Sequence, residues 1–158
     1  MNSWFECKVK YDKIDNEGRD KTVSEPYLVD AVSFTDAEKR VHKELEAYIT
    51  GEFLVTNIKI ANYSEIIPDE NGDRWFKCKI TYISLDEKSG KERKTNSYML
   101  VQSNTVKEAY NKLEKELGDM VSEYSIPAIQ ESPILDVFPY DASESIPEGL
   151  TPLDEAEN

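Results

Sequence analysis

The chain has 158 residues, 39% of them apolar and 32% charged, and a net charge of −13. This is the composition of a globular protein of one domain or two small packed units; with neither a membrane-length apolar run nor a signal-peptide pattern, we expect no membrane contact and a cytoplasmic location. Two cysteines and one histidine are too few for a disulfide scaffold or a structural zinc site, so we expect no metal and no cofactor.

The sequence of the first predicted strand occurs twice in the chain. Trp4 to Tyr11 (WFECKVKY) recurs as Trp75 to Tyr82 (WFKCKITY), with five of eight positions identical at an offset of 71. Trp and Cys are rare residue types, so chance is a poor explanation. An internal repeat must be recognised before any other feature of a fold, and we therefore expect a tandem duplication.

Each copy continues through a turn into a returning strand. The turns Asn16-Glu17-Gly18 and Lys88-Ser89-Gly90 predict hairpin tips. The returning strands align at the same offset of 71, as Pro26-Tyr27-Leu28-Val29 and Ser97-Tyr98-Met99-Leu100.

A helix is predicted next. Thr35-Asp36-Ala37-Glu38 and Thr105-Val106-Lys107-Glu108 fit the Thr-x-x-Glu capping box. Apolar residues then recur with the spacing of one helix face, and the equivalent positions differ by 72. They are Ala37, Val41, Leu45, Tyr48 and Ile49 in the first copy and Ala109, Leu113, Leu117, Met120 and Val121 in the second. We attribute the changed offset to residues inserted at the start of the second helix.

An extended segment follows each helix. The first, Phe53 to Ile67, is rich in β-branched and aromatic residues, and we expect it to form a hairpin with the strand at 75–82 through Asn71-Gly72. The second, Tyr124 to Phe138, contains Pro127 and Pro133, which favour an edge strand or an irregular copy.

The order β-β-α-β thus occurs at residues 1–68 and again at 73–138. It predicts an α+β fold with antiparallel sheets, two helices and a pseudo-twofold axis. We expect the units to form one compact domain, because about 70 residues with one helix are marginal alone.

Residues 139–158 are predicted to be a disordered acidic tail. Residues 116–158 hold 11 acidic and no basic residues, whereas residues 1–115 have a net charge of −2.

Alternate residues of a strand face opposite ways. One face is predicted to be core, with each cysteine a small buried hydrophobe: Phe5, Cys7, Val9 and Tyr11, and Phe76, Cys78, Ile80 and Tyr82. The other face carries Trp4, Lys8 and Lys10 in the first copy and Trp75, Lys77 and Lys79 in the second.

Aromatic rings beside lysines are typical of surfaces that bind single-stranded nucleic acid, because the rings stack bases and the lysines contact phosphates. The hairpin arms add Arg19, Lys21, Lys91, Arg93 and Lys94. The alternative is that each Trp caps a core and the lysines keep the sheet soluble.

No catalytic grouping is evident. The carboxylates lie on predicted helices, turns and the tail, His42 lies inside the first helix, and the glycines form no phosphate loop. Asp69 to Asp73 lacks the further ligands of a calcium loop. We expect no enzyme, although a site formed only between the units or between subunits stays open.

The pattern Trp-Phe-x-Cys-Lys-x-x-Tyr and the segment Pro26 to Ala31 resemble an uncharacterised domain family of gut Bacteroides-type bacteria and their crAss-like phages. The resemblance spans residues 1 to about 138 and implies no activity. The duplicated sheet-and-helix architecture is also similar to that of Whirly-like and PC4-like single-stranded DNA-binding proteins, which have four strands before their helix.

Two functions are consistent with these patterns. The first is a single-stranded DNA-binding protein whose acidic tail competes for the binding surface or docks a partner protein. The second is a protein-interaction adaptor without affinity for nucleic acid, favoured by a net charge of −13 that repels phosphate. The oligomeric state is left open, with a homodimer among the options.

Overall fold

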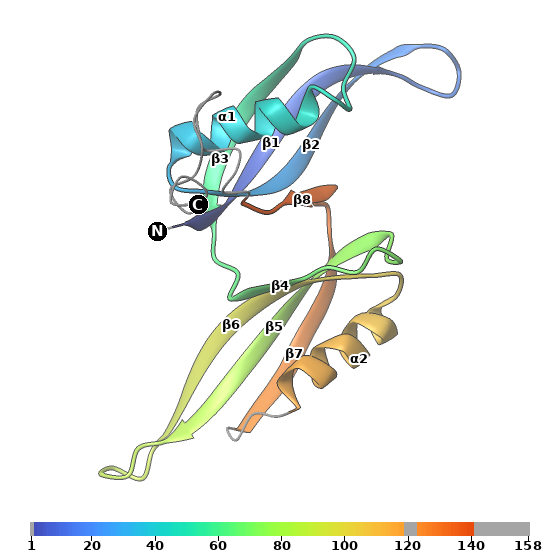
Figure 1. The fold of residues 1–158 in the computed structure, drawn as a ribbon. Helices are drawn as coiled ribbons and strands as arrows, with labels where there is room; N and C mark the ends of the chain where they lie inside the picture. Colours follow the sequence, from blue (N-terminus) through green and yellow to red (C-terminus); the bar gives the residue numbers. More distant parts are fainter. Residues whose placement is uncertain (1, 119–122, 141–158) are drawn as a thin grey trace, which may run out of the picture.

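The computed structural model describes residues 2–118 and 123–140, and Figure 1 shows an α+β fold of two units with the same order of elements. The first unit consists of β1 (Ser3–Ile14), β2 (Asp20–Ala31), α1 (Phe34–Leu45), β3 (Phe53–Ala61) and β4 (Glu65–Ile67). The second consists of β5 (Arg74–Leu85), β6 (Glu92–Ser103), α2 (Val106–Leu117), β7 (Glu123–Ser132) and β8 (Asp136–Phe138). The fold class agrees with the prediction and the order of elements is repeated, with two strands after each helix where one was predicted. The predicted tail from residue 141 onward lies outside the described residues.

The two long hairpins, β1–β2 and β5–β6, turn where the sequence predicts. Gly18 and Gly90 have φ angles of 80° and 69°, a region that a residue without a Cβ enters without strain. The amide of Gly18 donates to the carbonyl of Asp15 (3.1 Å), and that of Gly90 donates to the carbonyl of Asp86 (2.8 Å).

The units exchange their last strands. The sheets have the orders β3-β1-β2-β8 and β4-β6-β5-β7, so β4 of the first unit joins the second sheet and β8 of the second unit joins the first. Both exchanged strands pair in parallel, β4 with β6 and β8 with β2. Equivalent backbone hydrogen bonds form where the chain crosses from one sheet to the other. The amide of Ser64 donates to the carbonyl of Tyr98 (2.8 Å), and the amide of Leu135 donates to the carbonyl of Pro26 (3.0 Å).

The predicted hairpin between the third strand and β5 is therefore wrong. The segment at 53–67 is not one strand: β3 ends at Ala61 after pairing with β1, and β4 starts a separate pairing with β6. The exchange places Ile66 and Val137 against an apolar cluster between the units, which a continuous strand could not do. As predicted, β7 is an edge strand, and Pro127 lies where its register with β5 shifts.

Each unit has its own core, and a third cluster joins the two. Each helix covers one face of its sheet, with Ala37 and Val41 of α1 packing on Phe5, Cys7 and Val9. The second core is equivalent and consists of Phe76, Cys78, Ile80, Met99, Val101, Ala109, Leu113 and Leu117. The third cluster contains Leu28, Trp75, Leu100 and Ile134, all buried.

The register corrects the sequence alignment of the returning strands. Phe5 pairs with Val29 in the first hairpin, whereas Phe76 pairs with Val101 in the second. The returning strands are thus offset by 72, and the extra residue lies in the second hairpin rather than at the start of α2. Tyr27 is equivalent to Met99, and Tyr98 is equivalent to Pro26.

The helix starts are equivalent at the same offset. Thr105 caps α2 as predicted, accepting from the amide of Glu108 (3.1 Å). In the first unit the predicted cap at Thr35 is wrong, because Ser33 accepts from the amide of Asp36 (3.1 Å). The apolar stripe is buried except for Tyr48, which is 74% exposed beyond the end of α1. Met120 and Val121 lie outside the described residues.

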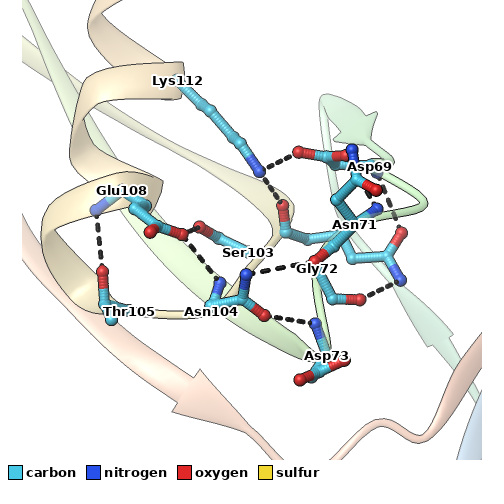
Figure 2. A network of polar contacts seen from close by, with 10 residues as sticks. Asp69, Asn71, Gly72, Asp73, Ser103, Asn104, Thr105, Glu108 and Lys112 are labelled. Atoms are coloured by element: carbon cyan, nitrogen blue, oxygen red, sulfur yellow. Dashed lines mark hydrogen bonds and ion pairs between the residues drawn. The ribbon is translucent and has the colours of Figure 1, made fainter.

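The turn that links the units is held against the second unit (Figure 2). The carboxylate of Asp69 forms an ion pair with Lys112 of α2, whose ammonium also donates to the carbonyl of Gln102 (2.8 Å). The side chain of Gln102 in turn bonds the amide of Asp69 (2.9 Å) and the carbonyl of Gly72 (3.1 Å). Asn104 bonds the amide of Asp73 (2.9 Å), so both ends of the turn are anchored to β6 and α2.

Gly72 is required at its place in this turn. A Cβ there would lie 2.7 Å from the backbone nitrogen of Ser103 and 2.9 Å from its Cα. Backbone atoms of a paired strand have little freedom to move, so the turn approaches β6 this closely only without a side chain.

The first unit has a corresponding cation on its helix. Arg40, which is equivalent to Lys112, donates from Nη2 to the carbonyl of Pro139 (3.3 Å), and its guanidinium lies 4.7 Å from the ring centroid of Tyr140. In both units, therefore, a helix cation holds the chain that leaves the exchanged strand.

Candidate nucleic-acid interface

The sequence-predicted site lies on the face of each sheet opposite its helix, here called the helix-free face. Phe5 and Cys7 of β1 pack under α1, so Trp4, Lys8 and Lys10 point the other way. Trp75, Lys77 and Lys79 occupy the same face of the second sheet. The two helix-free faces meet at the ends that carry the tryptophans, where the third cluster lies.

The contact between the two helix-free faces contradicts the predicted stacking role of Trp75. Its side chain is only 4% exposed, between Leu28, Leu100 and Ile134. Trp4 is partly buried against the same cluster. A base stacks only on an accessible ring, and burying a large aromatic side chain is strongly favourable, so Trp75 holds the units together instead.

The second unit retains an aromatic ring beside its lysines, and the ring is Tyr98. Lys79 lies directly opposite Tyr98 in the pairing of β5 with β6. The Nζ of Lys77 lies 4.8 Å from the centroid of the Tyr98 ring. All three side chains are partly buried, so each presents only part of its surface to solvent. The sequence offset of 71 aligns Tyr98 with Tyr27, whereas the strand register makes it equivalent to Pro26.

Within the second sheet, the residues next to Tyr98 on this face carry no acidic side chain. Its neighbours by strand register are Leu100, Asn96, Thr81, Gln130 and Ala128. The Thr81 hydroxyl donates to the side-chain carbonyl of Asn96 (2.9 Å), which orders the polar groups beside the ring. The Glu6 carboxylate of the first unit lines one cavity together with Lys77 and Tyr98, so a phosphate at Lys77 would lie near it.

The first unit lacks this arrangement. Lys8 and Lys10 are exposed, but the residue opposite Lys8 is Pro26, which offers no aromatic ring. Glu6 occupies the position equivalent to Lys77 and forms an ion pair with Lys59 (3.1 Å). The repeated lysine strands are therefore not equivalent as surfaces.

The hairpin arms do not join either surface into one platform. Figure 1 shows the β1–β2 and β5–β6 tips pointing in opposite directions at the two ends of the molecule. Arg19 is paired with Glu17 (2.7 Å), and Lys21 lies opposite Lys13. Lys91, Arg93 and Lys94 lie on the other arm. The structure thus separates the predicted site residues into two arms and two sheet faces.

A cavity of about 270 Å³ opens between the units next to Tyr98. Its polar lining comes from Glu6, Lys59, Asn62, Tyr63, Lys77 and Tyr98, and therefore from both units. Burial, with a smaller effect from the Glu6 carboxylate, raises the pKa of Tyr63 to about 12. Its phenol is consequently protonated at neutral pH and can donate a hydrogen bond.

A second cavity of about 270 Å³ lies where equivalent residues of both units face each other. It is mainly apolar, with matched pairs in its lining: Trp4 and Trp75, Ile66 and Val137, and Pro68 and Pro139. Gln102 and Asp136 complete the lining. This cavity, here called the axial cavity, has the composition of a small apolar binding site.

The two thiols and the imidazole of the described residues lie outside both cavities. Cys7 and Cys78 are fully buried as predicted, and burial raises their thiol pKa values to about 12 and about 11. His42 stacks on Phe53 with ring centroids 4.8 Å apart. Over the part of the chain that the structure describes, no three His, Cys, Asp or Glu side chains are grouped to hold a metal ion.

A family model described as a domain of unknown function (DUF4494) matches residues 3–140. The chain belongs to this family. The match runs from β1 past the end of β8, so both units lie within one family domain. Comparison with curated proteins and with solved structures gives no match, so the expected likeness to Whirly-like and PC4-like proteins gains no support. Neither helix is long and apolar enough to cross a membrane, within the residues described.

Proposed function

We propose that this DUF4494 protein binds single-stranded DNA in the cytoplasm, on the helix-free face of its second unit, and catalyses no reaction. The observation that supports this most is the Tyr98 ring, which has the Lys77 ammonium 4.8 Å from its centroid and Lys79 directly opposite in the strand pairing. A ring flanked by cations is the repeating element of surfaces that bind single strands.

The energies favour a base over the lysine at this ring. A cation–π contact at an accessible site contributes about 0.5–1 kcal/mol, whereas stacking a base contributes about 1–3 kcal/mol. An incoming base would displace the Lys77 ammonium from Tyr98, and the released ammonium would contact a neighbouring phosphate. Lys79, which lies opposite Tyr98 in the strand pairing, would contact a second phosphate.

The charge of the chain restricts this binding to a short, salt-sensitive contact. Residues 1–115 are close to neutral, with a net charge of −2, so long-range attraction of DNA is weak. The acidic residues from Glu116 onward would compete with phosphate for the lysines, as the sequence predicts, and would offer a docking segment for a partner protein.

A matched pair of double variants tests the site. Lys77→Gln with Lys79→Gln removes two cations beside Tyr98, and Lys8→Gln with Lys10→Gln removes two cations from the equivalent strand of the first unit. Fluorescence anisotropy of labelled oligothymidine at several salt concentrations would measure both. We expect the first pair to weaken binding and to flatten the dependence of log affinity on log salt by about 0.7 per lost phosphate contact. Lys8→Gln with Lys10→Gln should change neither the affinity nor its dependence on salt.

A Tyr98→Leu variant separates stacking from charge. It should weaken binding about tenfold without changing the salt slope, because stacking contributes about 1–3 kcal/mol and carries no charge. Equal effects of the two double variants, or no binding of oligothymidine at low salt, would overturn the proposal.

The axial cavity favours a second candidate, an adaptor that binds a partner protein without affinity for nucleic acid. An apolar cavity lined by two tryptophans and two prolines fits an apolar side chain of a partner. Quenching of tryptophan fluorescence by a captured partner, in a preparation that binds no oligothymidine, would support the adaptor. Quenching by DNA alone would count against it.

A further inference from the structure

The cavity beside Tyr98 exists because the two units differ at their crossings. Tyr63 precedes the crossing into β4, and its equivalent before β8 is Ile134. Ile134 is 4% exposed and fills its side of the junction, whereas Tyr63 is only partly buried and borders the cavity of about 270 Å³. Tyr98 lines the open side, and the equivalent residue on the filled side is Pro26. One side of the junction is therefore packed, and the other is open and polar.

The open side presents a paired acceptor and donor. Glu6 lies at the cavity with its side chain 25% exposed, and its carboxylate holds the Lys59 ammonium at 3.1 Å. One carboxylate oxygen is bonded to Lys59, yet a carboxylate has about four lone-pair sites, so both oxygens can accept further bonds. The Tyr63 phenol and the Lys77 ammonium add donors at the same cavity.

We propose that this cavity binds a guanine base of single-stranded DNA, an inference that rests on the proposed function. The edge of guanine carries two adjacent N–H donors, N1–H and N2–H, beside the acceptor O6. A carboxylate can accept both donors at once while the neighbouring ammonium donates to O6, which makes three bonds to the Glu6–Lys59 pair. Adenine, cytosine and thymine each offer this pair one donor and one acceptor, which makes two.

The neighbouring groups suit the rest of the nucleotide. Tyr98 and Tyr63 are the two rings at the cavity, and either can stack on the face of a base. Lys77 borders both this cavity and the Tyr98–Lys79 surface, so it would contact the phosphate that joins the bound guanosine to the next nucleotide. The cavity would thus add a base-selective position to a surface that is otherwise indifferent to sequence.

The experiment compares oligothymidine with the same oligomer carrying one central dG, dA or dC, by fluorescence anisotropy on the full chain. We expect the dG oligomer to bind about tenfold more tightly than the other three, the discrimination typical of one good bidentate base contact. Glu6→Gln should abolish this preference, because the carboxamide has one acceptor oxygen and cannot accept both guanine donors. Lys59→Met, which loses the donor to O6, should reduce the preference and serves as a second variant if Glu6→Gln fails to fold.

Glu131→Gln is the matched control for charge. It removes a carboxylate that pairs with Arg74 (3.7 Å) on the outer edge of the second sheet, away from the cavity, and should keep the preference for dG. Equal affinity for all four oligomers, with oligothymidine still bound through Lys77 and Lys79, would overturn the guanine site and leave the proposed function standing. Failure to bind any of the four would overturn both.

Discussion

The two units share a core and differ in their surfaces. Phe5, Cys7 and Val9 of the first unit and their equivalents in the second are all buried beneath a helix. The same strands carry Glu6 and Lys77 at equivalent positions, one paired with a lysine and the other lying over an aromatic ring. A duplicated sequence therefore preserves the interior, whereas each exposed face depends on what the exchanged segments bring beside it.

The tryptophans show this most clearly. Trp4 and Trp75 occupy the same place in their strands, but Trp75 is buried in the cluster between the units and Trp4 is only partly buried. The burial of Trp75 comes with Leu28, Leu100 and Ile134, which approach it from other parts of the chain. Equivalent residues have equivalent environments only where all their neighbours are duplicated too.

The largest expected effect is on stability at these tryptophans. Trp75→Ala should lower the free energy of unfolding by about 3–5 kcal/mol, as for other fully buried aromatic residues. Trp4→Ala should cost about 1–2 kcal/mol, because part of its surface is already in water. Urea unfolding would measure both values. Equal losses would mean that the cluster between the units is symmetric.

A smaller effect on stability is expected in the turn that links the two units. Gly72→Ala places a Cβ 2.7 Å from the backbone nitrogen of Ser103, so turn or strand must shift, at about 1–3 kcal/mol. Asn71→Ala is the control, because only backbone atoms of Asn71 bond within this turn, and it should change stability by less than about 0.5 kcal/mol. Thermal unfolding of both variants tests whether the turn is anchored.

The helix caps should behave alike in the two units. Ser33→Ala and Thr105→Ala each leave an amide without its acceptor and should each cost about 1 kcal/mol. Thr35→Ala, at the position that the sequence pattern favoured, should cost less than about 0.5 kcal/mol. A larger loss at Thr35 than at Ser33 in chemical unfolding would restore the original cap assignment.

The smallest expected effect is a pH dependence at the linking turn. The bond from Lys112 holds the pKa of Asp69 below its usual value, so the stability that this pair contributes is present at neutral pH. It is lost as the pH falls through the lowered pKa, because the protonated carboxyl no longer attracts the ammonium. The difference in unfolding free energy between wild type and Lys112→Met should therefore shrink below about pH 4.

The control is Lys115→Met, at an exposed position on the same helix, which should leave the acid profile unchanged. A difference for Lys112→Met that is constant from neutral to acid pH would show that its bond to the Gln102 carbonyl, and not the ion pair, contributes the stability.

The sequence predicted the elements and the core but not how the units combine. Alternation identified the buried faces of β1 and β5, and helical spacing identified the stripe of Val41, Leu45 and Leu113, because these patterns are local. The exchange of β4 and β8 was not predicted. Pairing between strands far apart in sequence leaves no local signal, and three residues carry almost no periodicity.

The candidate site suffered from the same limitation. The lysines were found from their alternation, whereas the burial of Trp75 involves Ile134, which comes from the segment between β7 and β8. Tyr98 was aligned one residue out of register, with Tyr27 instead of Pro26, and a shift of one residue moves a strand side chain to the opposite face. Checking the helix offset of 72 against the returning strands would have exposed it.

Exchanged strands also have a consequence for synthesis of the chain. The first sheet lacks its fourth strand until β8 has been made, and 74 residues separate Ala61 from Asp136. At about 5–20 residues per second this is a wait of roughly 4–15 s. During it the outer edge of β2 is open to pairing with other chains, a known route to aggregation. On the ribosome, the half that is translated first is therefore the half that is completed last.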